Sequence, residues 1–221
     1  MKKLVLVIGP EATGTRVLTE IFSQHPKILG TSNASSHHDC LDLVWKELEA
    51  GNIEKAVGLM PDIQQFECIL SRRSLPHSLE VGKAAKFMKF VNLKNIHKLC
   101  LAMNLDLVLL ITTRSAVAHL AAWTLTRSST QKSWEKADLQ YHQAYLYLFS
   151  FIKRYKTSFY FVSLESLLLD QQKYVQSIFQ LLDISSYEVS LNLNFQVNHR
   201  RYDWYIENKS ELRSKAGDLK G

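Results

Sequence analysis

Apolar residues along this chain follow two different spacings, which alternate from one segment to the next. Short unbroken apolar runs are typical of strands that are buried on both faces, whereas apolar residues three and four positions apart are typical of amphipathic helices. The unbroken runs predict strands at 4–8, 27–30, 65–71, 105–113 and 158–163. The second spacing predicts a helix that follows residues 13–16 and reaches residue 24, and further helices at 41–50, 53–60, 92–104, 115–126, 130–155 and 170–182.

Strands that alternate with helices of ten or more residues predict an α/β fold with a parallel sheet. The length of 221 residues suits one well-buried domain and is too short for two comfortable ones. The sequence contains no internal repeat, no low-complexity tract and no clear linker. We therefore expect residues 1–221 to form a single domain.

The first strand, the turn after it and the following helix form the stretch around which the chain is organised. Gly9 and Gly14 are separated by four residues, which is the spacing of a P-loop. Thr15 stands where a P-loop has its Lys, and Arg16 stands where it has the hydroxyl that binds Mg²⁺. The free N–H groups of the helix and the guanidinium of Arg16 predict a metal-free site for a 5′-phosphate group. The alternative is a plain strand–turn–helix that contains two glycines.

Cationic residues also follow two other predicted strands. Arg72 and Arg73 come directly after the strand at 65–71, and Arg114 comes after the strand at 105–113. Ligands of open parallel sheets bind beyond the carboxyl ends of the strands. We therefore expect these cations and the turn after the first strand to converge on one anion site.

The composition, 46% hydrophobic and 22% charged, is that of an ordinary globular protein. No apolar run approaches the roughly 20 residues of a membrane span, and the first run is shorter than the roughly 7–15 residues of a signal-peptide core. We interpret that run as the first strand of a cytoplasmic protein. The net charge of +6 fits an anionic ligand, but no basic run with interleaved aromatic residues favours nucleic acid. Cys40, Cys68 and Cys100 have neither metal nor disulfide spacing and are expected to be reduced thiols.

Residues Thr13-Gly14-Thr15-Arg16 resemble the phosphosulfate-binding loop of the sulfotransferases, [RK]-[ST]-G-T-[TSR], with Ala12 at the position of the first cation. These enzymes transfer a sulfuryl group from 3′-phosphoadenosine 5′-phosphosulfate (PAPS). The segment 109–114 resembles the second signature of the family, a strand that ends in the Arg binding the 3′-phosphate, and Ala122 stands at the position of its partner Ser. The resemblance implies a three-layer α/β fold, with a central parallel sheet flanked by helices in a P-loop nucleoside-kinase-like topology.

Three later segments extend the resemblance. Residues 163–167 and the helix up to 184 look like the family's Y-E-x-L…F-L-G segment, and 71–77 lie where the cytosolic members carry K-T-H-L-P. The basic residues 198–202 are similar to the late R-K-G segment, so the tail 185–221 is expected to close over the nucleotide site; a solvated basic patch is the alternative. The resemblance implies no metal, and it implies cofactor contacts from Ala12, Thr13, Gly14, Thr15, Arg16, Arg114, Arg200 and Arg201.

Sulfuryl transfer requires stabilisation of charge on the leaving oxygen and a base for the acceptor hydroxyl. By analogy with phosphoryl transfer, cations near the turn serve the first need, and the candidates are Arg16 and either Arg72 or Arg73. A solvated pair at a strand end is the alternative for Arg72 and Arg73. Histidine is the base best matched to neutral pH, but alignment with K-T-H-L-P puts Ser74 at the position of the family's His. The candidate bases are therefore His77, His37 and His38, followed by Glu11 and Glu80.

We therefore expect a PAPS-dependent sulfotransferase that acts on a hydroxyl of a small-molecule or glycan acceptor. A carbohydrate is the acceptor class that we consider first. One alternative is a P-loop small-molecule kinase, which Thr15 and Arg16 disfavour. Another is a nucleotide-binding module without catalysis, which Ala12 and Ala122 keep open. Aromatic residues at helical spacing either line an acceptor pocket or belong to the core: Trp123, Trp134, Tyr141, Tyr145 and Trp204.

Overall fold

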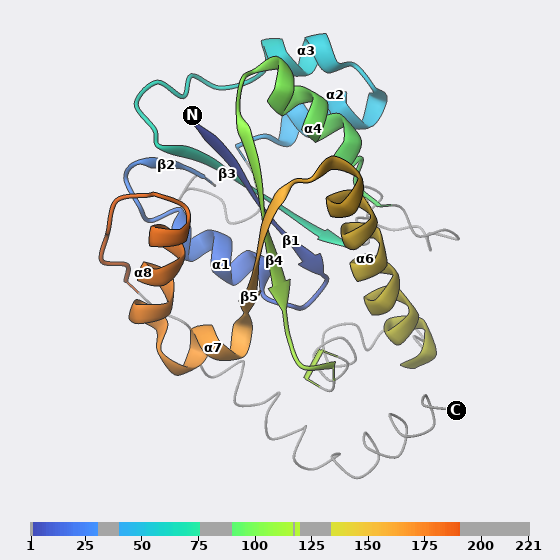
Figure 1. Cartoon of the computed structure of the whole chain (residues 1–221), viewed down its shortest axis with the longest axis vertical. Coiled ribbons are helices and arrows are strands. Elements are labelled where there is room, and N and C mark those ends of the chain that lie inside the picture. Colours follow the sequence, from blue (N-terminus) through green and yellow to red (C-terminus); the bar gives the residue numbers. More distant parts are fainter. Residues whose placement is uncertain (1, 31–39, 76–89, 117, 120–133, 191–221) are drawn as a thin grey trace.

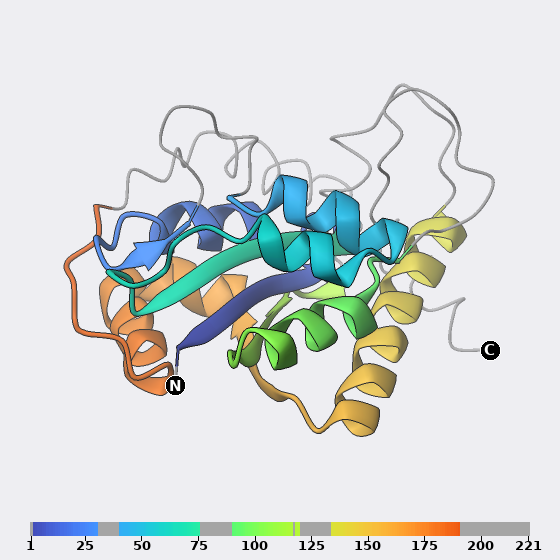
Figure 2. The same ribbon diagram turned by 90° about the horizontal axis from the view of Figure 1, so that it is seen from above.

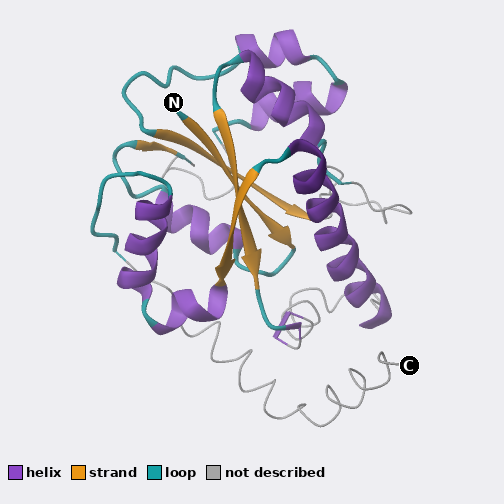
Figure 3. Cartoon of the chain, viewed as in Figure 1, coloured by secondary structure: helices purple, strands orange, loops and turns teal. Residues whose placement is uncertain are grey.

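In the part of the chain that the structure describes, five strands form one parallel sheet in the order β2-β3-β1-β4-β5. The structure is a computed structural model, and it describes residues 2–30, 40–75, 90–116, 118–119 and 134–190. Figure 1 shows β1 in the middle of the sheet, and Figure 3 shows that the strands all point toward the same edge. This carboxyl edge positions the candidate site. The strands are β1 Lys3–Pro10, β2 Ile28–Leu29, β3 Cys68–Leu75, β4 Asp106–Thr113 and β5 Ser158–Ser163.

Helices cover both faces of the sheet, as the two views in Figures 1 and 2 show. One layer packs its apolar residues with those of a hydrophobic cluster that includes Val5 and Val7, and the other packs around Leu4, Leu6 and Ile8. The first layer holds α1 Thr15–Phe22, α7 Leu164–Leu169 and α8 Gln171–Leu181. The second holds α2 Asp42–Ala50, α3 Ile53–Gly58, α4 Leu93–Ala102 and α6 Trp134–Tyr155.

The unbroken apolar run of β1 is buried on both sides because successive side chains of a strand point to opposite faces. All five residues from Leu4 to Ile8 are 0% exposed. Burial of such a side chain contributes about 1.5–3 kcal/mol, so β1 helps to hold both helical layers on the sheet. The predicted α/β class is confirmed, with its three layers, its central parallel sheet and its P-loop nucleoside-kinase-like topology.

The strand β3 differs from its predicted range, 65–71. It begins at Cys68 and continues to Leu75, because residues 71–75 pair with residues 6–10 of β1. The polar residues in this extension have partners inside the fold. The indole N–H of Trp45 donates to Ser71 Oγ at 2.9 Å, and Arg73 pairs with Asp42. Buried polar groups are tolerated when they are hydrogen-bonded, so the polar sequence does not end the strand.

Other boundaries agree with the predicted elements within a few residues, with two exceptions. The helix α7 was not predicted, because its six residues show too little periodicity; it is capped by Ser163, whose side chain accepts the N–H of Ser166. Most of the predicted helix at 115–126 lies outside the described residues. Among the helices of the described segments, none is long and apolar enough to cross a membrane.

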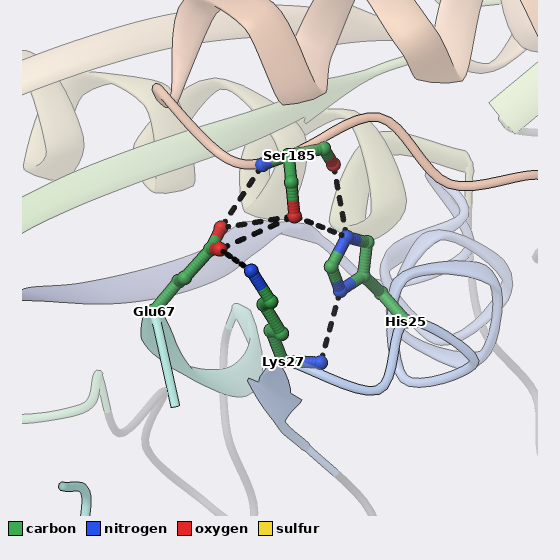
Figure 4. Close-up of polar contacts among 4 residues, drawn as sticks. All are labelled: His25, Lys27, Glu67 and Ser185. Carbon is green, nitrogen blue, oxygen red and sulfur yellow. Dashed lines mark hydrogen bonds and ion pairs between the residues drawn. The ribbon is translucent and has the colours of Figure 1, made fainter. Parts of the chain in front are cut away.

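The chain after α8 returns to the amino edge of the sheet, where a polar cluster holds it (Figure 4). His25 Nε2 lies 2.9 Å from the carbonyl oxygen of Ser185, and Nδ1 accepts the N–H of Lys27 at 3.0 Å. Glu67 accepts the N–H of Ser185 at 2.9 Å and pairs with the ammonium group of Lys27 at 2.8 Å. These contacts fix the first described residues of the tail predicted to close over the nucleotide site; residues 191–221 lie outside the described part.

Candidate anion-binding site

The turn between β1 and α1 requires glycine at both ends. A Cβ atom on Gly9 would lie 2.3 Å from Thr112 Oγ1 and 2.7 Å from the carbonyl oxygen of Thr112, so only glycine allows β1 and β4 to approach this closely here. Gly14 has φ of 95°, in the left-handed region that glycine adopts most readily. Ala12 also has a positive φ, 69°. The spacing of the two glycines therefore reflects real constraints of the turn.

The side chain of Thr13 closes the turn from within. Its Oγ1 donates to the carbonyl oxygen of Pro10 at 2.6 Å and lies 2.7 Å from Thr112 Oγ1, and the residue is 1% exposed. The backbone N–H of Thr13 also bonds the Pro10 carbonyl, at 3.2 Å. The Thr13 hydroxyl thus ties the turn to β4, and its predicted contact with a cofactor stays a prediction.

The first turn of α1 presents backbone donors at the carboxyl edge of the sheet. Gly14 is the N-cap residue, so no side chain caps the helix, and Leu18 donates its N–H to the Gly14 carbonyl at 3.0 Å. The N–H groups of the three residues between them have no acceptor within the helix. No acidic residue stands in this first turn. The donors and the positive end of the helix dipole therefore favour an anion.

Arg114 lies against this turn. Its guanidinium Nη1 donates to the carbonyl oxygen of Ala12 at 3.1 Å, although the two residues are 102 positions apart. The contact arises because Arg114 directly follows β4, and β4 is paired with β1. The structure therefore brings together the turn and the strand-end cation, as the sequence predicted for this pair.

Arg16 lies on the outer surface of α1. Its Nε donates to Glu20 Oε1 at 2.6 Å, one helical turn further on, and its side chain is 51% exposed. An exposed pair of this kind is worth about 0.3–0.5 kcal/mol. Arg16 can therefore leave Glu20 for a ligand anion at little cost.

The two arginines of β3 lie on opposite faces of the sheet. Arg73 points to the layer of α2, where its guanidinium lies 4.3 Å from the ring centre of Trp45 and 3.4 Å from Asp42 Oδ1. Arg73 is 8% exposed. Arg72 and Ser74 share the other face because side chains alternate along a strand. Ser74 Oγ lies 3.1 Å from Thr15 Oγ1, so this face of β3 borders the turn.

A histidine that sequence reasoning missed lies close to Arg114. His119 is 2% exposed, and its ring centre is 4.7 Å from that of Tyr141. Burial, followed by the positive charge of Arg114, lowers the pKa of His119 to about 4. The residue is therefore neutral at pH 7. Its position five residues after Arg114 was the one available signal, and that spacing carries no recognised motif.

Two tyrosines of α6 bind the carboxyl end of β4. Tyr145 donates its hydroxyl to the carbonyl oxygen of Thr112 at 3.0 Å, and Tyr141 donates to that of Arg114 at 2.9 Å. Their rings are 4.9 Å apart between centres. Their helical spacing fits either an acceptor pocket or the core, and in the structure both hold the carboxyl end of β4 beside the turn.

Several predicted site residues fall outside the described residues, so their positions are not part of this geometry. They include all three candidate histidine bases, both arginines of the tail and the position of the family's partner Ser: His37, His38, His77, Arg200, Arg201 and Ala122.

The sheet order, the glycine-flanked turn and the strand-end cation together define a P-loop-like α/β protein with an anion-binding geometry. Comparison with family models and with curated proteins gives no match. Among solved structures, the chain is similar to a sulfotransferase from Alicyclobacillus acidocaldarius, with 13% identity, 97% of this chain and 95% of that chain covered, and a TM-score of 0.49. It is also similar to mouse sulfotransferase SULT7A1 complexed with PAP, with 13% identity, 85% of this chain and 60% of that chain covered, and a TM-score of 0.43. Similarity of this degree concerns the backbone alone, and a function has to rest on the residues of this chain.

Proposed function

We propose that this chain is a sulfotransferase that moves a sulfuryl group from PAPS to a hydroxyl of an acceptor, with a carbohydrate as the acceptor class. The observation that carries the proposal is the 3.1 Å contact between the Arg114 guanidinium and the Ala12 carbonyl. This contact puts a cation beside backbone donors at a helix N-terminus, which suits a ligand with two separate anionic groups.

The two anionic ends of the nucleotide match the two parts of the site. The backbone N–H groups from Gly14 to Arg16 would bind the 5′-phosphosulfate, with the Arg16 guanidinium exchanging Glu20 for its oxygens. Arg114 would bind the 3′-phosphate, as the resemblance to the second signature implies. Arg200 and Arg201 are proposed to join it from the tail. Thr15, in place of a P-loop Lys, keeps its hydroxyl bonded to Ser74.

The transfer is an in-line displacement at sulfur. A bond forms between sulfur and the acceptor oxygen while the bond between sulfur and the bridging oxygen of the nucleotide breaks, and the acceptor proton passes to a base. Charge grows on the bridging oxygen, and the turn's N–H groups with Arg16 stabilise it. Arg72 shares its face of β3 with Ser74, whose hydroxyl lies 3.1 Å from that of Thr15 in α1, so we propose Arg72 ahead of Arg73 as the second cation. His77, His37 and His38 stay the proposed bases.

A thermal-shift experiment tests the proposal. A ligand that binds only the native state adds RT ln(1 + [L]/Kd) to the free energy of unfolding and so raises the melting temperature. We expect adenosine 3′,5′-bisphosphate to raise it without any divalent ion, and ATP with Mg²⁺ to leave it unchanged. The opposite result would identify a P-loop kinase. Binding of the bisphosphate without transfer of labelled sulfate to any hydroxyl acceptor would favour a module without catalysis.

A further inference from the structure

One peptide group next to Arg114 is held at both of its polar ends. The carbonyl oxygen of Arg114 accepts the hydroxyl of Tyr141 at 2.9 Å, and the N–H of Ser115, in the same peptide group, donates to Glu165 Oε1 at 2.9 Å. The two partners come from different elements, α6 and α7. Because a peptide group is planar, fixing both ends fixes its rotation and with it the direction in which Arg114 leaves the strand.

Glu165 is itself held in place. Its second oxygen, Oε2, accepts the hydroxyl of Ser163 at 3.2 Å, and the same hydroxyl accepts the N–H of Ser166 as the cap of α7. The carboxylate therefore links the start of α7 to the turn after β4. This geometry leaves the side chain little freedom to rotate away from Ser115.

Tyr141 is equally constrained. Its ring packs against that of Tyr145, one turn further along α6, with the ring centres 4.9 Å apart. It also packs against the ring of His119, at 4.7 Å. Burial raises the pKa of the Tyr141 hydroxyl above its usual value, so the group stays protonated and donates throughout the physiological range. The donor that fixes the Arg114 carbonyl is thus present at every pH at which the protein would work.

We propose that Tyr141 and Glu165 are positioning residues that aim Arg114 at the 3′-phosphate of the nucleotide. This inference rests on the proposed function. Neither residue touches the ligand; each acts through the peptide group between Arg114 and Ser115. Positioning matters because a bidentate contact of guanidinium with phosphate depends on alignment as well as on charge.

The test compares two nucleotides that differ only in the 3′-phosphate, adenosine 3′,5′-bisphosphate and adenosine 5′-monophosphate, by calorimetry. Tyr141→Phe removes one hydroxyl and should weaken binding of the bisphosphate about tenfold, while binding of the monophosphate stays within about twofold. Glu165→Ala should do the same, and Glu165→Gln, which keeps an acceptor oxygen, should recover most of the loss.

The matched control is Tyr147→Phe, on the same helix. Tyr147 donates its hydroxyl to the Val91 carbonyl at 2.5 Å and accepts the N–H of Leu93 at 3.3 Å, so this variant loses a bond of the same kind, and a second one, away from Arg114. It should leave both affinities unchanged. In the background of Arg114→Ala, the change Tyr141→Phe should cost nothing further, because residues that act through one another are not additive.

The outcomes separate the two proposals. A wild-type chain that binds both nucleotides equally would overturn the proposed function, and this inference with it. A wild-type chain that prefers the bisphosphate, together with a Tyr141→Phe variant that keeps the whole preference, would overturn the inference alone. If Tyr141→Phe fails to fold, Glu165→Ala and Glu165→Gln decide the question by the same comparison.

Discussion

His119 makes the stability of this protein depend on pH in a way that can be measured. The ring is 2% exposed, and burial holds its pKa at about 4 in the native state. In the unfolded chain the same ring has a pKa of about 6.5. Replacing His119 by Phe, which keeps a ring against Tyr141, removes the titration, and so does replacing it by Gln.

The sign and size follow from proton binding. Above pH 6.5 the ring is neutral in both states and its titration contributes nothing. As the pH falls below that value, the unfolded chain gains a proton that the native state refuses, so the free energy of unfolding falls by up to about 1.4 kcal/mol per pH unit. The loss ends near pH 4, where the native ring also takes its proton, and amounts to about 3 kcal/mol in total.

Urea denaturation at pH 7, 6, 5 and 4 measures this quantity for the wild type and both variants. Titrations of the other groups are shared by the three proteins and cancel in the difference. We expect the wild type to lose about 3 kcal/mol more than either variant between pH 7 and pH 4, whatever the absolute stabilities of the variants. Wild-type and variant curves that run parallel would show that His119 is not buried as described.

Three further predictions concern the turn, the arginines and the polar cluster at the amino edge. Gly9→Ala should destabilise the fold by about 1–3 kcal/mol in urea denaturation, because the added Cβ would overlap Thr112. Gly58→Ala, where the added Cβ meets open space, should not destabilise it. Equal effects of the two substitutions would contradict the close approach of β1 and β4. Arg73→Ala should lower the melting temperature clearly, since it removes the buried guanidinium that contacts Asp42 and Trp45. Arg16→Ala should change the melting temperature little and should abolish retention on an adenosine 3′,5′-bisphosphate resin. The reverse pattern would exchange the roles of the two arginines. The hydrogen bond from Lys27, followed by that from the Ser185 N–H, lowers the pKa of Glu67. The Glu67 carboxylate therefore stabilises the fold at neutral pH, and this stabilisation is lost as the pH falls through the lowered pKa. Glu67→Gln should flatten this part of the acid-denaturation curve, and an unchanged curve would exclude a role in the native state for the Glu67–Lys27 pair.

The sequence by itself determined the alternation of strands and helices and the position of the candidate anion-binding turn. These features depend on residues close together in the chain: the unbroken apolar run of β1, the spacing of Gly9 and Gly14, and the cation that follows β4. Each such signal can be recognised without knowing what packs against it. The parallel sheet then implied that the turn and Arg114 share one edge, and the structure has the contact.

Only the tertiary structure decided which face of the sheet each side chain of β3 occupies. A shift of one residue exchanges the two faces, so the separation of Arg73 from Arg72 and Ser74 depends on the pairing of β3 with β1. The tertiary structure likewise decided the burial of His119 and the hydrogen bonds of Tyr141 and Glu165 to one peptide group. These contacts join residues from α6, α7 and the turn after β4. Such contacts bring together residues that are distant in the chain, and no local pattern encodes which distant partner a buried polar group will find.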